Sequence, residues 1–373
     1  MKYIDEFRDA KVAQVLATKI RHAVQPDRTY HFMEFCGGHT HAIFRYGIPD
    51  LLPPNVKMIH GPGCPVCVLP MVRIDQAIEL ATRYGVTLCS YGDMLRVPGS
   101  RKASLLKARA QGADVRMVYS VTDALAIARQ EREKNVVFFA IGFETTTPPT
   151  AVALKQAARM QLTNFSIFCN HLLTPSAITA ILDSPEIRDY GTLALDGFVG
   201  PAHVSTVIGS QPYRYFAEEF QSPVVIAGFE PLDVLQAIYM LIKQVNEGRA
   251  EVENEFTRAV SERGNEKAKA LVAEVFELRK TFDWRGLGKV PYSALKIKAP
   301  WRFWDAEQRF PLSITKTNEN KACECPAILR GLKSPKDCTL FGALCTPDNP
   351  IGSCMVSSEG ACAAYYSYGQ GHG

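Results

Sequence analysis

The chain has 373 residues, of which 47% are hydrophobic and 21% charged, a composition typical of a globular protein with two or three domains. Its formal net charge of +4 is too small to indicate a nucleic-acid partner, and its longest apolar run, residues 136–143, is far too short to span a membrane. The first residues lack the continuous apolar core of a secretory signal. We therefore expect a cytoplasmic protein, in which clustered cysteines indicate metal or redox chemistry.

The first 70 residues predict a helix and then two strand–turn–helix units. Apolar side chains recur at helical spacing over residues 4–23. A strand at 30–35 leads into Cys36-Gly37-Gly38-His39-Thr40-His41, and a strand at 56–60 leads into Gly61-Pro62-Gly63-Cys64-Pro65-Val66-Cys67. In α/β sheets the carboxyl ends of such strands are where ligands bind. A cysteine at the start of the following helix would also have a lowered pKa.

Cys36, His39 and His41 form a compact set of one thiol and two imidazoles. Sulfur and imidazole ligands together suit iron, zinc or copper. The alternative interpretation is a buried cysteine whose neighbouring histidines cap a helix or serve as polar core groups.

Cys64 and Cys67 have the C-x-x-C spacing of a thiol–disulfide pair, in which one thiol is activated and the other resolves. Half of a metal site is the second interpretation, although no second C-x-x-C is present to complete it. The third interpretation is that both cysteines only pack in the protein interior and have no chemical role.

The middle of the chain alternates strands and helices, which predicts parallel sheets. Strands are expected at 86–93, 114–120, near 136–141 and at 165–171, and helices at 72–84, 121–130 and 151–160, with Thr122 or Asp123 as a cap. Glu144, in the sequence GFETT, is a candidate ligand or base, while the two threonines after it are as readily explained as helix caps. Cys89 and Cys169 lie in apolar strands and are expected in the core.

From about residue 241 the character changes, with charged helices expected at 248–260 and 265–280 before a cysteine-rich tail. We therefore place domains at 1–120, 121–240 and 241–373. The tail contains six of the eleven cysteines, namely Cys323, Cys325, Cys338, Cys345, Cys354 and Cys362.

The spacing of the tail cysteines favours a [4Fe-4S] cluster. Zinc sites usually take two close C-x2-4-C pairs, which this tail lacks. Thiolates spread over glycine- and proline-rich loops suit a cluster, because its corners accept ligands from distant segments. The preferred ligands are Cys323, Cys338, Cys345 and Cys362, with Cys325 as the substitute for Cys323. Zinc, disulfides or buried free thiols remain the alternatives, and Cys354 is expected to be a buried small hydrophobe.

Four motifs in order, CGGHTH, GPGCPVC, GFETT and the tail C-x14-C-x6-C-x16-C, resemble the HypD family of hydrogenase maturation factors over essentially the whole chain. The resemblance implies two Rossmann-like α/β domains around a cleft plus a cluster domain. It also implies a role in assembling the Fe(CN)2CO moiety of [NiFe]-hydrogenase, together with the small chaperone HypC and the cyanide donor HypE, which carries a thiocyanate.

When the family's residue roles are transferred to the matching motifs, the resemblance implies that Cys36 is the iron-binding thiolate and that His41 lies nearby. Cys64 and Cys67 would be the redox pair, and the cluster cysteines would exchange electrons with that pair. Because electron transfer requires proximity, we expect the tail to fold back against the 61–67 loop. Outside its complexes the protein is expected to be a monomer.

Two other functions remain open from the sequence. The chain could be a cluster-containing oxidoreductase that acts on a small molecule in the interdomain cleft, although it has no G-x-G-x-x-G or G-x-x-x-x-G-K-[ST] motif. It could also be a structural iron–sulfur protein in which Cys36, Cys64 and Cys67 are inert.

Overall fold

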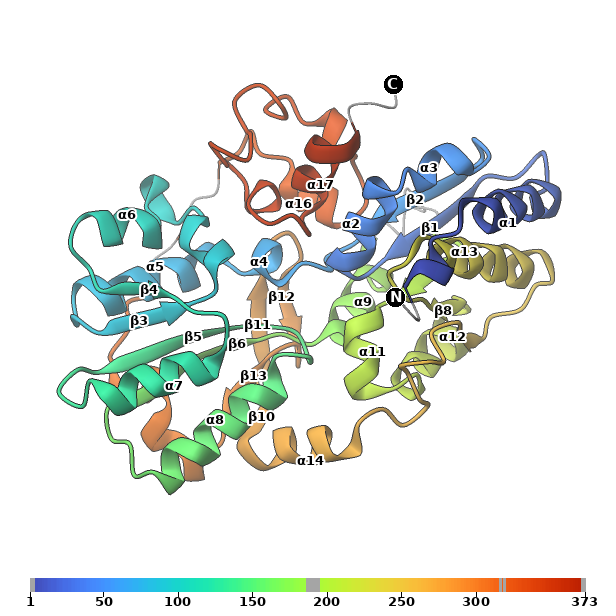
Figure 1. The fold of residues 1–373 in the computed structure, drawn as a ribbon. Helices are drawn as coiled ribbons and strands as arrows, with labels where there is room; N and C mark the ends of the chain where they lie inside the picture. Colours follow the sequence, from blue (N-terminus) through green and yellow to red (C-terminus); the bar gives the residue numbers. More distant parts are fainter. Residues whose placement is uncertain (1–3, 186–194, 315–316, 318–319, 370–373) are drawn as a thin grey trace.

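Two parallel β-sheets organise the chain in this computed structural model, which describes residues 4–185, 195–314, 317 and 320–369 (Figure 1). In strand order, the five-stranded sheet contains β2 (Val56–His60), β1 (Tyr30–Glu34), β7 (Gly197–Gly200), β8 (Val224–Ile226) and β9 (Val252–Asn254). The four-stranded sheet contains β4 (Val115–Met117), β3 (Thr87–Ser90), β5 (Val136–Gly142) and β6 (Phe165–His171). All neighbouring strands in both sheets are parallel, which confirms the predicted α/β class with Rossmann-like sheets.

The sheets divide the chain differently from the expected boundaries at 120 and 240. The strands before residue 61 pair with strands after residue 196, and strands on both sides of residue 120 share the four-stranded sheet. The chain therefore leaves the first sheet after β2, builds the second sheet and then returns. Local βα patterns indicate that parallel strands exist, but they do not show which strands pair.

Helices cover both faces of each sheet, as parallel strands require. On the five-stranded sheet lie α1 (Ala10–Ala23), α2 (Gly37–Arg45), α3 (Ile48–Leu51) and α13 (Pro231–Asn246), with α9 (Thr174–Leu182), α11 (Ala202–Ile208) and α12 (Arg214–Phe220) on the other side. On the four-stranded sheet lie α5 (Met71–Thr82) and α6 (Leu105–Ala110), opposite α7 (Val121–Gln130) and α8 (Thr147–Arg159). The short α4 (Pro65–Val68) lies where the chain passes between the sheets (Figure 1).

The N-cap of α7 is Ser120, in a capping box with Asp123, so the expectation of Thr122 or Asp123 as the cap was wrong.

The segment after residue 247 contributes less helix than predicted. Residues 248–260 contain the short strand β9, which pairs with β8, because tertiary strand pairing overrides weak helical propensity. Two antiparallel hairpin-like pairs and short helices follow: α14 (Glu266–Val275), β10 (Phe276–Leu278), β11 (Thr281–Trp284), β12 (Gly288–Pro291), β13 (Leu295–Ile297), α15 (Ala306–Arg309), α16 (Cys325–Leu329) and α17 (Ala361–Tyr368). No helix within the described ranges combines the length and apolar character that a membrane span requires.

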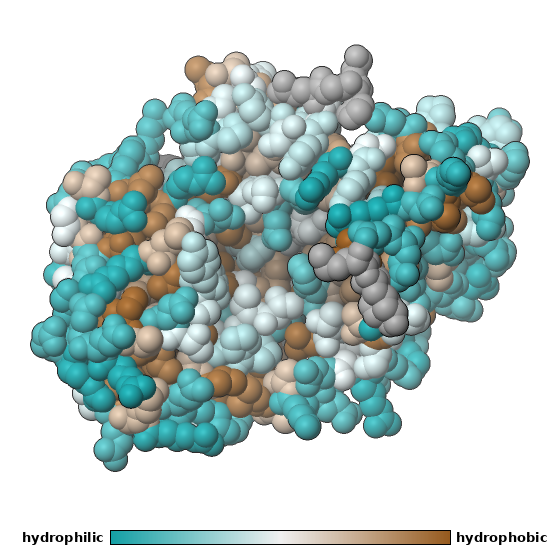
Figure 2. All heavy atoms as spheres, viewed as in Figure 1, coloured by the Kyte–Doolittle hydropathy of each residue, from teal (hydrophilic) through white to brown (hydrophobic). Residues whose placement is uncertain are grey.

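The cysteine-rich tail shares a hydrophobic core with the four-stranded sheet. One continuous cluster of buried side chains includes Cys67 of α4, Phe139 of β5, Trp284 of β11 and the tail residues Cys354 and Cys362. In Figure 2 hydrophilic residues predominate on the two outer flanks, mixed with hydrophobic ones, and residues of intermediate hydropathy predominate between them. The tail therefore packs onto the Cys64–Cys67 loop as well as being connected to it through the chain.

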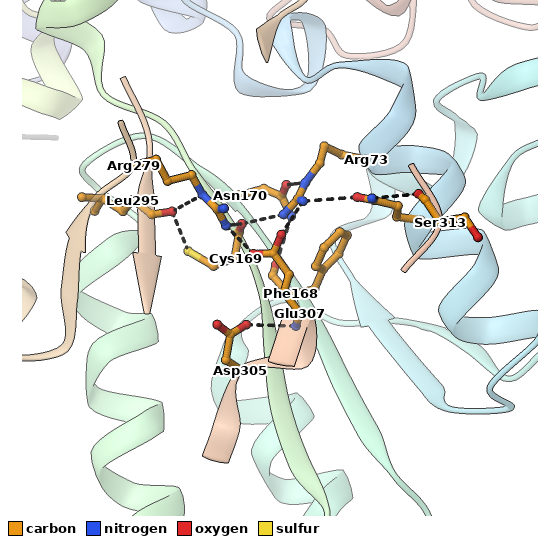
Figure 3. A network of polar contacts seen from close by, with 10 residues as sticks. Arg73, Phe168, Cys169, Asn170, Arg279, Leu295, Asp305, Glu307 and Ser313 are labelled. Carbon is orange, nitrogen blue, oxygen red and sulfur yellow. Dashed lines mark hydrogen bonds and ion pairs between the residues drawn. The ribbon is translucent and has the colours of Figure 1, made fainter. Parts of the chain in front are cut away.

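Arg73 joins α5 to β6 and to the segment that precedes the tail (Figure 3). Its buried guanidinium donates to the side chain of Asn170, to the carbonyl of Cys169 at 3.0 Å and to Glu307 at 2.6 Å. Glu307 also pairs with Arg279. This network holds the helix that follows the C-x-x-C loop against the end of the central strands.

Replacing Arg73 by Met is expected to lower the free energy of unfolding by about 3 kcal/mol, because it removes one partner of a buried ion pair and leaves Glu307 undercompensated. Urea unfolding followed by circular dichroism measures this change. The matched control is Arg83→Met at the end of the same helix, whose ion pair with Glu79 is exposed and contributes less than about 0.5 kcal/mol. Equal stability losses in the two variants would contradict the role of the network.

Candidate functional site

The two glycine loops that follow β1 and β2 pack directly against each other. The N–H of Gly37 donates to the carbonyl of Gly63 at 3.0 Å, and the N–H of Gly61 donates to the carbonyl of Glu34 at 2.9 Å. A Cβ atom at Gly63 would lie 2.5 Å from the backbone nitrogen of Cys36, so this position requires glycine. The parallel strands thus bring the CGGHTH and GPGCPVC motifs together at the carboxyl edge of the sheet.

Cys36 is the N-cap residue of α2, and its buried thiol lies among backbone donors. Burial raises the pKa of Cys36 to about 12, and the charges of Glu359 and Glu34 add to this, while the N–H groups of Gly38 and His203 oppose it. The expectation of a lowered pKa was therefore wrong, because desolvation outweighs the helix dipole in this site. A bound metal cation would reverse that balance, since coordination deprotonates a thiol.

Glu34 ties the two loops together beneath Cys36. Its carboxylate accepts the backbone N–H of Cys36 at 2.8 Å, the hydroxyl of Thr40, and Nδ1–H of His60 at 3.0 Å. Glu34 is fully buried, so each of these bonds is made away from water. The carboxylate therefore sets the position of the Cys36 backbone relative to the end of β2.

The two histidines of the CGGHTH motif have different surroundings. Nε2–H of His39 donates to the carbonyls of Ala227 and Gly228 at 3.1 and 2.9 Å, which ties α2 to the loop after β8. His41 faces the tail, with its ring 5.2 Å from that of Tyr368, and its buried Nδ1 has no hydrogen-bond partner among the described residues. His39 is therefore a positioning residue, whereas His41 keeps a free ring nitrogen that could serve as an acceptor.

Cys64 and Cys67 are joined as a disulfide at the start of α4. The hydroxyl of Ser353 donates to the carbonyl of Cys67 at 2.8 Å, and Sγ of Cys67 lies 3.8 Å from the carbonyl oxygen of Ser353. A Cβ atom at Gly360 would lie 3.0 Å from Sγ of Cys67. The expected return of the tail to the 61–67 loop is confirmed, across 286 residues of sequence.

The tail cysteines gather around one small cavity. Its lining includes Cys323, Cys325, Cys338, Cys345 and Cys362, together with apolar side chains such as Phe341 and Met355. The thiol of Cys325 also hydrogen-bonds with that of Cys354. All four preferred ligands and the substitute Cys325 therefore line one cavity. A Cβ atom at Gly360 would lie 2.3 Å from the backbone carbonyl oxygen of Cys354 and 3.0 Å from Sγ of Cys67, so Gly360 lies against both residues.

The donor set of this cavity is compatible with the predicted iron–sulfur cluster. Soft thiolates in an apolar, enclosed setting are the ligands that such clusters take. Among the residues that the structure describes, no three His, Cys, Asp or Glu side chains converge as a single-ion site would require. A four-iron cluster separates its ligands more widely than one ion does, so the cluster remains the prediction and the choice between Cys323 and Cys325 stays open.

Glu144 follows β5 and is buried at the start of the turn into α8. Its carboxyl oxygens accept the N–H of Thr174 at 2.9 Å and the hydroxyl of Thr174 at 3.0 Å. Burial raises the pKa of Glu144 to about 7 despite these bonds.

Thr146 is the N-cap residue of α8, although its side chain makes no capping bond and donates to the carbonyls of Ile141 and Phe143 instead.

The raised pKa of Glu144 predicts a pH-dependent stability. The folded state holds the proton up to about pH 7, whereas the unfolded carboxyl releases it near its ordinary pKa of 4.5. The free energy of unfolding should therefore fall by up to about 3 kcal/mol as the pH rises from 4.5 to 7. Glu144→Gln should lack this decline, and the difference between the two proteins in urea unfolding at several pH values isolates Glu144 from the other titrating groups. Parallel curves for the two proteins would contradict the assignment.

Sequence reasoning missed one residue beside Cys36. Glu359, in the tail, packs on the first turn of α2. A Cβ atom built at Gly37 would lie 2.4 Å from the Cβ atom of Glu359. Burial and the charges of Asp93 and Glu34 raise its pKa. A lone acid next to glycine in the apolar segment before Cys362 is the sequence signal that could have singled it out.

Comparison with known proteins identifies the family of this chain. The HypD family model, described as "Hydrogenase formation hypA family", matches residues 11–369. The chain is 66% identical to hydrogenase maturation factor HypD of Azotobacter vinelandii over 370 residues, covering 99% of this chain and 97% of that protein. It is 64% identical to HypD of Cupriavidus necator, covering 99% and 98% of the two chains. It is 43% identical to HypD of Escherichia coli K12, covering 99% of each.

The chain belongs to the HypD family of hydrogenase maturation factors. The fold brings together three motif-bearing segments of this chain: the Cys36 loop, the Cys64–Cys67 loop and the tail. The match runs through both sheets and the cysteine-rich tail, so the HypD relationship concerns the whole chain and not one domain.

Proposed function

We propose that this HypD protein is the scaffold on which the Fe(CN)2CO moiety of [NiFe]-hydrogenase is assembled. The observation that carries the proposal is the packing of the Cys36 loop, the Cys64–Cys67 pair and the cysteine-lined cavity around one another. Cys36 would hold the iron that is being built, as a soft thiolate in a buried, water-poor position. The relatives named above are all hydrogenase maturation factors, which favours this function over a small-molecule oxidoreductase.

The Cys64–Cys67 pair would provide the electrons for cyanide release. Cleaving a thiocyanate, R–S–CN, to a thiol and cyanide takes up two electrons, and oxidising a dithiol to a disulfide supplies two electrons and two protons. The S–CN bond breaks, the carrier sulfur takes one of the two protons, the other proton is released to solvent, and cyanide passes to the iron as the anion. The disulfide seen here corresponds to the oxidised form of the pair.

A [4Fe-4S] cluster held by Cys323 (or Cys325), Cys338, Cys345 and Cys362 would supply single electrons when bound. The fold places the tail close to the Cys64–Cys67 pair, because Ser353 donates a hydrogen bond to Cys67 and Gly360 packs against Sγ of Cys67. His41 of α2 and the buried Glu144 are proposed as supporting residues of this centre. The partners would be a HypC-type chaperone and a HypE-type cyanide donor in the cytoplasm, with a monomer outside these complexes.

Anaerobic purification with HypC co-expressed, followed by iron and sulfide analysis and infrared spectroscopy, tests the proposal. We expect about four irons and four sulfides of cluster together with bands in the cyanide and carbonyl stretching region. A cluster without such bands, when the full set of maturation partners is present, would reject the scaffold function and leave an iron–sulfur protein of other purpose.

A further inference from the structure

The strand β2 forms an open edge of the five-stranded sheet (Figure 1). Its inner side pairs with β1, as the bonds from the N–H of Tyr30 to the carbonyl of Asn55 and from the N–H of Gly61 to the carbonyl of Glu34 show. In a parallel ladder with this register, Lys57 and Ile59 face β1, so Met58 and His60 direct their backbone groups outward. Within the described part of the chain, no backbone hydrogen bond satisfies these outward groups of Met58 and His60.

This open edge is the floor of a groove of about 350 Å³. All five residues of β2 line it, together with Phe44 of α2 and Tyr365 of α17, whose rings meet edge to face at 5.1 Å. The other lining residues are mainly prolines and aliphatic side chains. Unpaired strand groups between apolar walls are the arrangement in which an extended peptide adds a strand to a sheet.

The charges around the groove have one sign. Lys57 and Lys333 lie among the lining residues, which include no aspartate or glutamate. Lys333 pairs with Glu324 outside the groove, whereas Lys57 is exposed. An occupant with carboxylates flanking its apolar residues would complement this rim.

One lining residue of the groove, His60, is connected to Cys36 by hydrogen bonds. His60, the last residue of β2, donates to Glu34, which in turn accepts the backbone N–H of Cys36. A strand lying along β2 would therefore end beside the residue that holds the iron in the proposed function. A partner that shares this iron must bring its own chain to the same place.

We propose that β2 is the docking edge for an extended segment of the HypC-type chaperone, apolar at alternate positions and flanked by acidic residues. This inference rests on the proposed function, because that function supplies the partner. The segment would hydrogen-bond to the backbone of Met58 and His60, pack alternate side chains against the paired rings of Phe44 and Tyr365, and lead the chaperone toward Cys36.

Amide hydrogen exchange on the unmodified protein, resolved to single residues, tests the proposal without any risk of misfolding. Adding purified HypC should slow exchange at Met58 and His60 at least about tenfold. The amides of Lys57 and Ile59, already bonded to β1, should not change. Unchanged exchange at Met58 and His60 in a complex that does form would overturn the docking edge and leave the scaffold function intact.

Met58→Pro provides the matching variant, because proline removes only the outward N–H and is tolerated on edge strands. It should weaken HypC binding at least about tenfold in titration calorimetry, while Met58→Leu binds as the wild type does. If Met58→Pro lost binding of HypE but still bound HypC, the proposed occupant would be wrong. It would also be wrong if self-association of the protein, without HypC, protected the amides of Met58 and His60. A wild-type protein that binds no HypC would reject the partnership in the proposed function itself.

Discussion

Cys36→Ala is expected to lose all infrared bands from iron-bound cyanide and carbon monoxide. The thiol is the only sulfur of the CGGHTH motif, and it lies buried at the point where the two glycine loops meet. Without it, the only sulfur groups left in the neighbouring loop are Cys64 and Cys67, which are joined as a disulfide and therefore offer no thiolate to the iron. The measurement is infrared spectroscopy of the anaerobically purified complex with HypC.

Cys89→Ala is the matched control for this experiment. Cys89 is also fully buried and also has a pKa raised to about 12 by burial, but it lies in β3 within the core. The control should retain the bands at wild-type intensity. Bands of equal intensity in Cys36→Ala would show that another residue anchors the iron.

Cys338→Ala is expected to reduce the cluster content from about four irons per chain to below about one, because a cluster with three remaining ligands is not retained through purification. Cys338 lines the cavity shared by the other tail thiols. Iron and sulfide analysis with electron paramagnetic resonance of the reduced protein measures the loss. Cys169→Ala, at a buried cysteine of β6, is the control and should keep the full cluster.

The same assay distinguishes Cys323 from Cys325. Sγ atoms of both residues lie close to Gly352, at 2.6 and 2.5 Å from a Cβ atom built there, so distance alone does not separate them. We expect Cys323→Ala to lose the cluster and Cys325→Ala to keep it. The reverse result would make Cys325 the ligand, and retention of the cluster in Cys338→Ala would reject the predicted ligand set.

Much of the local structure was predictable, because strand, glycine turn and helix are governed by side-chain pattern over a few residues. The strand before Cys36, the strand before Gly61 and the buried strand before Glu144 all form as expected. The positions of Cys89 and Cys169 in the core were predictable for the same reason, since both lie within uninterrupted apolar runs. Residues 248–260 were mispredicted because their charged pattern carries little information about a short strand that is formed by pairing.

The sequence by itself determined the chemistry that is available: the thiols, their spacing and the turns that expose them. Only the tertiary structure decided which groups meet. The pairing of β1 with β7, the seating of Ser353 on Cys67 and the approach of Glu359 to Gly37 join residues far apart along the chain, and no local pattern specifies such pairings. The pKa of Cys36 was decided in the same way, because burial, which depends on the whole fold, outweighs the helix end that the sequence reveals.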